Sequence, residues 1–267
     1  MRLLAIVRST IALSWREATA YRFNFVMSFL VIAVPFLLQV FLWVAVFSGR
    51  GQVAGYSLSG IIVYYVLALF LYDFVHPAVL YDVSNDIKSG ELAAHLLRPL
   101  PYPLWALAVR LGSQAVYLAV VTVVVGAGAA LLSWAGYLSV NDFSMAGLLR
   151  FAVMFLAAWL LGLLFSLAAS FAVFFTEDAT GLSKLVSFIF PLLSGSLIPL
   201  DMLPGWIKNV CHYLPFRWLV YEPIRVYSGQ QPLAQALLAT AGWLGLAVAL
   251  VWWLWRAGEA RFTAVGG

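Results

Sequence analysis

Long apolar runs separated by short polar segments dominate the chain. Six runs are long enough to cross a bilayer, because a helical residue rises about 1.5 Å and the hydrocarbon core is about 30 Å thick. These predicted spans are residues 25–47, 57–80, 104–134, 148–175, 182–200 and 233–255. The pattern predicts an all-α integral membrane protein in which residues 1–267 form a single transmembrane domain.

The composition supports this interpretation. Of the 267 residues, 64% are hydrophobic and 10% are charged, whereas about a quarter of the residues in an average soluble domain are charged. The net charge of +4 does not indicate a nucleic-acid partner, because the basic residues are scattered between apolar runs. The single cysteine, Cys211, excludes an intrachain disulfide and a multi-cysteine metal site.

The distribution of lysine and arginine predicts the orientation of the spans, because these residues are retained on the cytoplasmic side. With the N-terminus inside, ten of the fifteen fall in cytoplasmic segments. The five on the outer side are Arg50, Arg150, Lys208, Arg217 and Arg225. We therefore expect a multi-pass protein with both termini in the cytoplasm.

Residues 1–24 carry regularly spaced arginines, at Arg2, Arg8, Arg16 and Arg22, with apolar residues between them. This spacing leaves no uninterrupted apolar stretch of the kind that a signal peptide requires. It favours an amphipathic helix that lies on the cytoplasmic face and leads, like an elbow, into the first span.

The cytoplasmic loop at residues 81–103 contains the segment NDIKSGELAAHLLRPLP, residues 85–101. Gly90 can redirect the backbone, and the residue before Pro99 avoids the helical region, so together they delimit a short helix. Its predicted apolar face contains Leu92, Ala93, Leu96 and Leu97. That face fits either the lipid interface or a docking protein.

Motifs that would support catalysis are missing from the sequence. No G-x-x-x-x-G-K-[ST] loop, H-E-x-x-H pair or G-x-S-x-G elbow occurs. The segment at residues 176–184 contains Gly181 and Lys184 at the wrong spacing for phosphate binding. We therefore expect a chain that is not itself an enzyme and holds no cofactor or metal.

Two groups of ionisable residues are candidates for a translocation path. Asp73 and His76 are three residues apart and share a helical face, where they could contact a substrate or serve as paired structural anchors. Glu222 lies near Arg217 and Arg225, which favours a local ion pair over contact with an anionic substrate. Both groups are therefore kept as candidates for the path, with a structural role as the alternative for each.

Small residues recur every fourth position in two spans, which favours close helix packing or subunit contact. They are Gly162, Ser166 and Ser170 in the fourth span, and Gly126 and Ala130 in the third.

Prolines crowd the region around the fifth span and the following external segment, residues 201–232. They are Pro191, Pro199, Pro204, Pro215 and Pro223. Proline interrupts helices, and unsatisfied backbone is costly in hydrocarbon. We therefore expect a re-entrant segment that is shielded by protein or enters the membrane only from the outer surface.

Two passages resemble the permease subunits of ABC-2 type ABC transporters, in the six-span bacterial branch of drug or viologen exporters. The cytoplasmic loop is similar to the pattern I-x-x-G-x-L-x-x-x-L-L-x-P-L, here from Ile87 to Leu100. The segment at residues 194–229 is similar to the family's S-G-x-x-x-P-x-x-x-x-P-x-W, L-P-F and Y-x-P-x-x-x-x-x-G series.

The resemblance implies an exporter subunit of the bacterial plasma membrane that moves a hydrophobic or amphiphilic substrate. It implies a dimer with a second permease chain, powered by separate ATPase subunits that bind ATP and Mg. The cytoplasmic loop would be the coupling helix that docks on the ATPase, through Ile87, Lys88, Gly90, Glu91, Leu92, His95, Leu96, Leu97, Arg98 and Pro99. The alternatives are an ion-coupled secondary transporter with Asp73 and His76 as a proton relay, and a membrane scaffold that transports nothing.

Overall fold

The computed structural model describes residues 2–20, 22–76, 81–139, 142–176 and 179–262, and these residues are almost entirely helical. The long helices are α1 (Arg2–Ala20), α2 (Arg22–Phe47), α3 (Leu58–Val75), α6 (Tyr102–Trp134), α7 (Met145–Phe171), α8 (Ala179–Ser194) and α11 (Leu233–Glu259). The short ones are α4 (Tyr81–Ser89), α5 (Leu92–Leu96), η2 (Ala172–Phe175), η3 (Leu200–Met202), α9 (Gly205–His212), η4 (Pro215–Trp218) and α10 (Tyr221–Tyr227).

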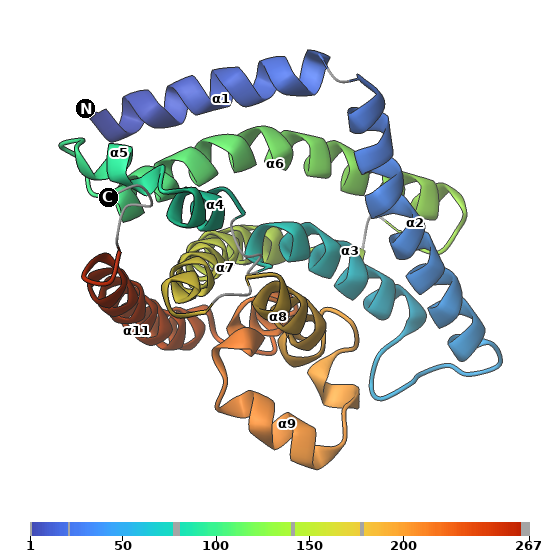
Figure 1. Cartoon of the computed structure of the whole chain (residues 1–267). Coiled ribbons are helices and arrows are strands. Elements are labelled where there is room, and N and C mark those ends of the chain that lie inside the picture. Colours follow the sequence, from blue (N-terminus) through green and yellow to red (C-terminus); the bar gives the residue numbers. More distant parts are fainter. Residues whose placement is uncertain (1, 21, 77–80, 140–141, 177–178, 263–267) are drawn as a thin grey trace.

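Helix α7 lies at the centre of the bundle, where it packs against α3, α10 and α11 (Figure 1). Leu161 and Leu167 on α7 are completely buried, as are Ile61 and Leu71 on α3. Many large apolar side chains elsewhere are exposed, such as Leu131 on α6. A buried centre with an apolar exterior is the pattern expected of helices that face lipid or another subunit.

Among the residues that the structure describes, four helical stretches are long and apolar enough to cross a membrane. They are Leu58–Val75, Tyr102–Trp134, Met145–Phe175 and Leu233–Glu259, which correspond to the second, third, fourth and sixth predicted spans. The first and fifth correspond to α2 and α8, whose apolar helical stretches in the described part of the chain, Ala33–Phe47 and Lys184–Ser194, are shorter.

The predicted fifth span, residues 182–200, is wrong at its C-terminal end. Helix α8 stops at Ser194, and Gly195 then turns the chain with a φ of +83°, a conformation that glycine adopts readily. The predicted second span also extended too far, since α3 ends at Val75 with His76 as its C-cap; residues 77–80 lie outside the described residues.

Helix α1 runs beside α6 (Figure 1). The contact is close at Gly112 of α6, where an added Cβ would lie only 2.6 Å from the Cβ of Thr10. The expected helix at residues 1–24 is therefore present over Arg2–Ala20 and packs along a candidate span, while its role as an interfacial elbow stays a prediction.

The two predicted stripes of small residues have different environments. Gly162 lies against α3, because an added Cβ would be 2.6 Å from the backbone oxygen of Val75. Ser166 and Ser170 are buried and donate hydrogen bonds to the carbonyls four residues earlier. An added Cβ on Gly126 would meet no atom within 4 Å. The first stripe therefore packs within the chain, and the second lies on an open face of α6.

The segment after α8 is broken into short helical pieces, as the prolines predict. Pro199 and Pro204 are the N-cap residues of η3 and α9, and Pro215 begins η4. Pro191 and Pro223 instead lie inside α8 and α10. These pieces place a cluster of charged and aromatic side chains beside the N-terminal part of α3.

Candidate functional site

The loop between α3 and α6 contains two helices rather than the single predicted one. Gly90 separates α4 from α5 with a φ of +82°, in the left-handed region that glycine tolerates best. Ile87 and Lys88 therefore belong to α4, while Glu91 is the N-cap residue of the five-residue α5.

The leucines of this loop, which were predicted to form one apolar face, differ in exposure. Leu92 is fully buried, whereas Leu96 is 39% exposed and Leu97 is 89% exposed. The neighbouring Arg98 and Pro99 are also exposed. Leu92 anchors the loop to the bundle, and the last two leucines are presented outward, where another surface could cover them.

His95 ties α5 to the rest of the molecule. Its Nε2 lies 3.9 Å from Oδ2 of Asp86 on α4, and the same carboxylate oxygen accepts a 2.6 Å hydrogen bond from the hydroxyl of Tyr102. The imidazole ring also lies 4.2 Å, between centroids, from the ring of Trp105. Burial lowers the pKa of His95, and the positive charge of Arg98 lowers it further, which favours the neutral imidazole at pH 7.

These contacts continue into two candidate spans. The ring of Tyr102 stacks on that of Trp255 near the end of α11, with 5.5 Å between centroids. Ala5 and Ile6 of α1 line a cavity of about 420 Å³ together with His95 and Arg98. The beginnings of α1 and α6, the end of α11 and the α4–α5 loop therefore meet at one end of the molecule (Figure 1).

Asp73 and His76 occupy different environments. The carboxylate of Asp73 has the hydroxyl of Tyr117 as its polar neighbour, and its Oδ2 is buried without a hydrogen-bond partner. The ring of His76 packs against Tyr72 and Phe190, each about 5.1 Å away between centroids. No ion pair joins Asp73 to His76 within the described part of the chain, so the suggested pairing of the two is not found.

Glu222 forms the expected ion pair and is the most buried charged residue described. Its side chain is 0% exposed, and Oε1 accepts hydrogen bonds from Arg217 and, at 3.4 Å, from Arg225. Arg217 also contacts Nδ1 of His212. The arrangement links η4, α9 and α10, so the three path candidates of this segment lie together.

A second charged cluster lies beside the first, around Asp201. Lys208 donates a 3.0 Å hydrogen bond to Oδ1 of Asp201, and the hydroxyl of Tyr56 donates to Oδ2 at 3.3 Å. Burial alone would raise the pKa of Asp201, but hydrogen bonds from Tyr221 and Lys208 outweigh it and lower the pKa. The cluster joins the loop before α3 to the segment before α9.

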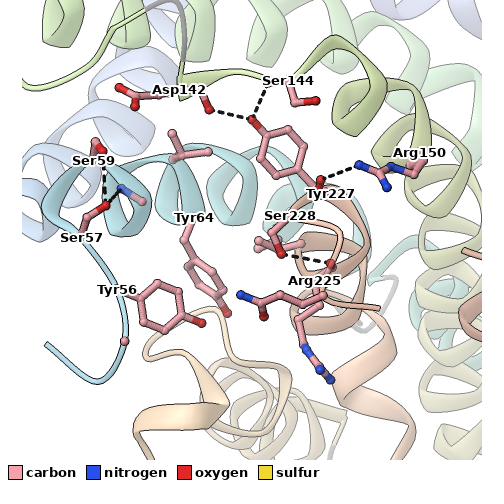
Figure 2. Close-up of a pocket in the computed structure, with 15 residues that line it drawn as sticks. Tyr56, Ser57, Ser59, Tyr64, Asp142, Ser144, Arg150, Arg225, Tyr227 and Ser228 are labelled. Atoms are coloured by element: carbon pink, nitrogen blue, oxygen red, sulfur yellow. Dashed lines mark hydrogen bonds between the residues drawn. The ribbon is translucent and has the colours of Figure 1, made fainter. Parts of the chain in front are cut away.

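A polar cavity of about 450 Å³ opens between the beginning of α3, the beginning of α7 and α10 (Figure 2). Arg150 of α7 and the aromatic rings of Tyr56, Tyr64 and Tyr227 line it. From the sequence, Arg150 was predicted only to mark the outer side of the membrane, and the tyrosines were not predicted as site residues. Arg150 lies five residues after the start of α7, in an otherwise apolar helix. A charged residue at such a position was the one sequence signal that could have indicated a site there.

Comparison with known proteins identifies a family for most of the chain. The family model described as ABC-2 family transporter protein matches residues 33–266. Among curated proteins, none matches the chain.

Proposed function

Because the chain belongs to the ABC-2 family of transporter proteins, and is thus a transporter permease of the membrane, we propose that it is the membrane subunit of an ATP-driven exporter. Separate ATPase subunits would bind ATP and Mg and hydrolyse the nucleotide. A second permease chain would complete the translocation path in the bacterial plasma membrane. The substrate would be hydrophobic or amphiphilic.

The observation that carries the proposal is the exposure of Leu96 and Leu97 at the C-terminal end of α5, a helix whose other end is held against the bundle. A single exposed leucine is common on protein surfaces. Two adjacent ones at the tip of a loop anchored by Leu92 and His95 form a small apolar surface that a partner protein could bury. The bias of lysine and arginine favours a cytoplasmic position for this loop, on the side where ATPase subunits would bind.

The contacts of the loop suggest how movement of an ATPase would reach the spans. A displacement of α5 would act through His95 on Trp105 and Tyr102, which lie in the first turn of α6. Tyr102 in turn packs on Trp255 of α11. Because packed side chains are nearly incompressible, these rings would pass the displacement on rather than absorb it. The two candidate spans would then move relative to α7 and open the path.

The second permease chain would pack on the open face of α6. Gly126 and Ala130 are both exposed, and a Cβ added to Gly126 would meet no atom of this chain within 4 Å; small residues allow helices to approach closely. Substitution of Gly126 by leucine is expected to reduce the dimer fraction, measured by size-exclusion chromatography with light scattering. An unchanged dimer fraction would place the interface elsewhere.

The experiment that tests the ATPase-docking proposal compares Leu97→Ala with Leu131→Ala. Both leucines are exposed, by 89% and 65%, but Leu131 lies near the opposite end of α6. Loss of one buried leucine from an interface would weaken association by about 1–2 kcal/mol, which is roughly five- to thirtyfold. We expect Leu97→Ala to reduce substrate-stimulated ATP hydrolysis by the reconstituted complex and Leu131→Ala to leave it unchanged. Equal activity of both variants would refute the docking role of Leu97.

A further inference from the structure

The polar cavity of Figure 2 has a composition that the permease role alone does not require. It is bordered by the N-terminal ends of α3 and α7 and by the C-terminal end of α10, and it is large enough for a small ligand or a headgroup. Three tyrosine rings, two serines before and within the first turn of α3, and Gln230 contribute to its walls.

Arg150 is the distinctive residue of this cavity. Its Nε donates to the carbonyl of Ala146 at 3.2 Å and its Nη2 to the carbonyl of Tyr227 at 3.4 Å. Within the residues that the structure describes, no carboxylate lies within 4.0 Å of its guanidinium group. A guanidinium group has five N–H donors, so the two backbone contacts leave donors and a full positive charge available.

The other cations of the α9–α10 segment each lie beside a carboxylate. Lys208 is paired with Asp201, and both Arg217 and Arg225 are paired with Glu222. Arg225 also borders the cavity, but its charge is shared with that carboxylate. Arg150 is thus the cavity cation whose charge the surrounding side chains leave unmatched.

The surroundings of Arg150 suit an anionic group. The turn after α10 passes beside the guanidinium group without crowding it, since a Cβ added to Gly229 would lie 3.8 Å from its Nη1, an ordinary contact distance. Ser57 and Ser59 offer hydroxyl groups on the opposite wall. The one acid of the lining, Asp142, uses its Oδ2 to accept a 2.7 Å hydrogen bond from the backbone of Ser139.

We propose that this cavity binds a phosphate or carboxylate group, with Arg150 as its principal partner. A planar guanidinium group binds such oxyanions through two parallel hydrogen bonds, and the other polar side chains that line the cavity would contact the rest of the ligand. The group would belong either to a free anionic molecule or to the headgroup of an anionic lipid. The inference rests on the proposed function for its position on the outer side of the membrane.

The test uses the full-length chain in phosphatidylcholine nanodiscs. Inorganic phosphate is titrated against chloride at constant ionic strength, and thermal unfolding is followed by tryptophan fluorescence, since a ligand that binds the folded state raises the midpoint. A second measurement compares the retention of phosphatidylglycerol and phosphatidylcholine by native mass spectrometry. Arg150→Gln is the test variant, and Arg50→Gln removes an exposed outer cation that does not line the cavity.

We expect binding to Arg150→Gln to be about tenfold or more weaker, the usual size of a lost charge-assisted contact, and binding to Arg50→Gln to be unchanged. Gln230→Glu, at an exposed position of the cavity wall, provides a second test by adding a negative charge without removing a helix contact. It should weaken binding as well.

The outcomes separate the two sources of the anion. Saturable phosphate binding that depends on Arg150 indicates a free anion, and selective retention of phosphatidylglycerol that depends on Arg150 indicates a lipid headgroup. Absence of both, or an equal loss in Arg150→Gln and Arg50→Gln, would overturn the proposal. Neither measurement involves an ATPase. A negative result here therefore does not affect the proposal that an ATPase docks at Leu97, and a negative result for docking does not affect the proposed anion site.

Discussion

Replacing Glu222 by glutamine perturbs the most deeply buried charge in the described part of the chain. The carboxylate is 0% exposed, and it is the shared partner of Arg217 and Arg225, whose side chains are 12% and 27% exposed. The substitution would leave two neighbouring guanidinium groups without a counter-charge. Breaking a fully buried pair costs about 3–5 kcal/mol, and because Arg225 is partly solvated we expect about 2–4 kcal/mol here.

The assay is equilibrium unfolding of the purified chain in mixed micelles, with Lys208→Gln as the control. Lys208 also forms an ion pair in the same segment, but its side chain is 51% exposed, so its loss should cost no more than about 1 kcal/mol. If the two variants are equally stable, the buried ion pairs of Glu222 do not contribute more to the free energy of unfolding than the exposed pair of Lys208 does.

Three further substitutions test other contacts. Gly162→Ala should destabilise the chain by about 1–3 kcal/mol, since the new methyl group would overlap the α3 backbone, while Gly126→Ala should not; equal stabilities in urea titrations would contradict the close approach of α3 and α7. The lowered pKa of His95 means that the folded loop binds fewer protons than the unfolded one. Loop protection in hydrogen exchange should therefore weaken as pH falls from about 7 to 5, and His95→Gln should remove this dependence; a pH dependence that persists would assign it to another group. Asp73→Asn should reduce transport in proteoliposomes if Asp73 lines the path. The variant should still fold, because the buried Oδ2 has no hydrogen-bond partner that the substitution would remove. Full transport would remove Asp73 from the path.

The helical architecture could largely be predicted from the sequence, because apolar runs of about 20 residues leave few alternatives in a membrane protein. Four of the predicted spans coincide with helices that could cross a membrane. The errors arose where backbone geometry decides the outcome. Gly195 adopts a positive φ and follows the end of α8, inside the apolar run that was predicted as the fifth span. Gly90 was expected to delimit the short helix α5, but the helix before it, α4, was not predicted.

The site was harder to predict because side-chain direction depends on tertiary contacts. Leu92 and Leu97 look equivalent in the sequence, yet one is fully buried and the other 89% exposed. The ion pairs of Glu222 followed from proximity in sequence, since its partners are three and five residues away. Arg150 lies 77 residues from Tyr227, its contact in the cavity, and no local pattern relates residues so far apart.

Cross-linking from Leu97 tests the docking proposal most directly. The only cysteine in the sequence, Cys211, is buried, so a Leu97→Cys variant in a Cys211→Ser background carries one reactive thiol at the tip of the loop between α3 and α6. We expect a short bifunctional thiol–amine reagent to join this position to an ATPase subunit in native membranes, and a Leu131→Cys control to give no such product. Recovery of the Leu97→Cys chain without an ATPase adduct, while the reagent labels its thiol, would contradict the proposal.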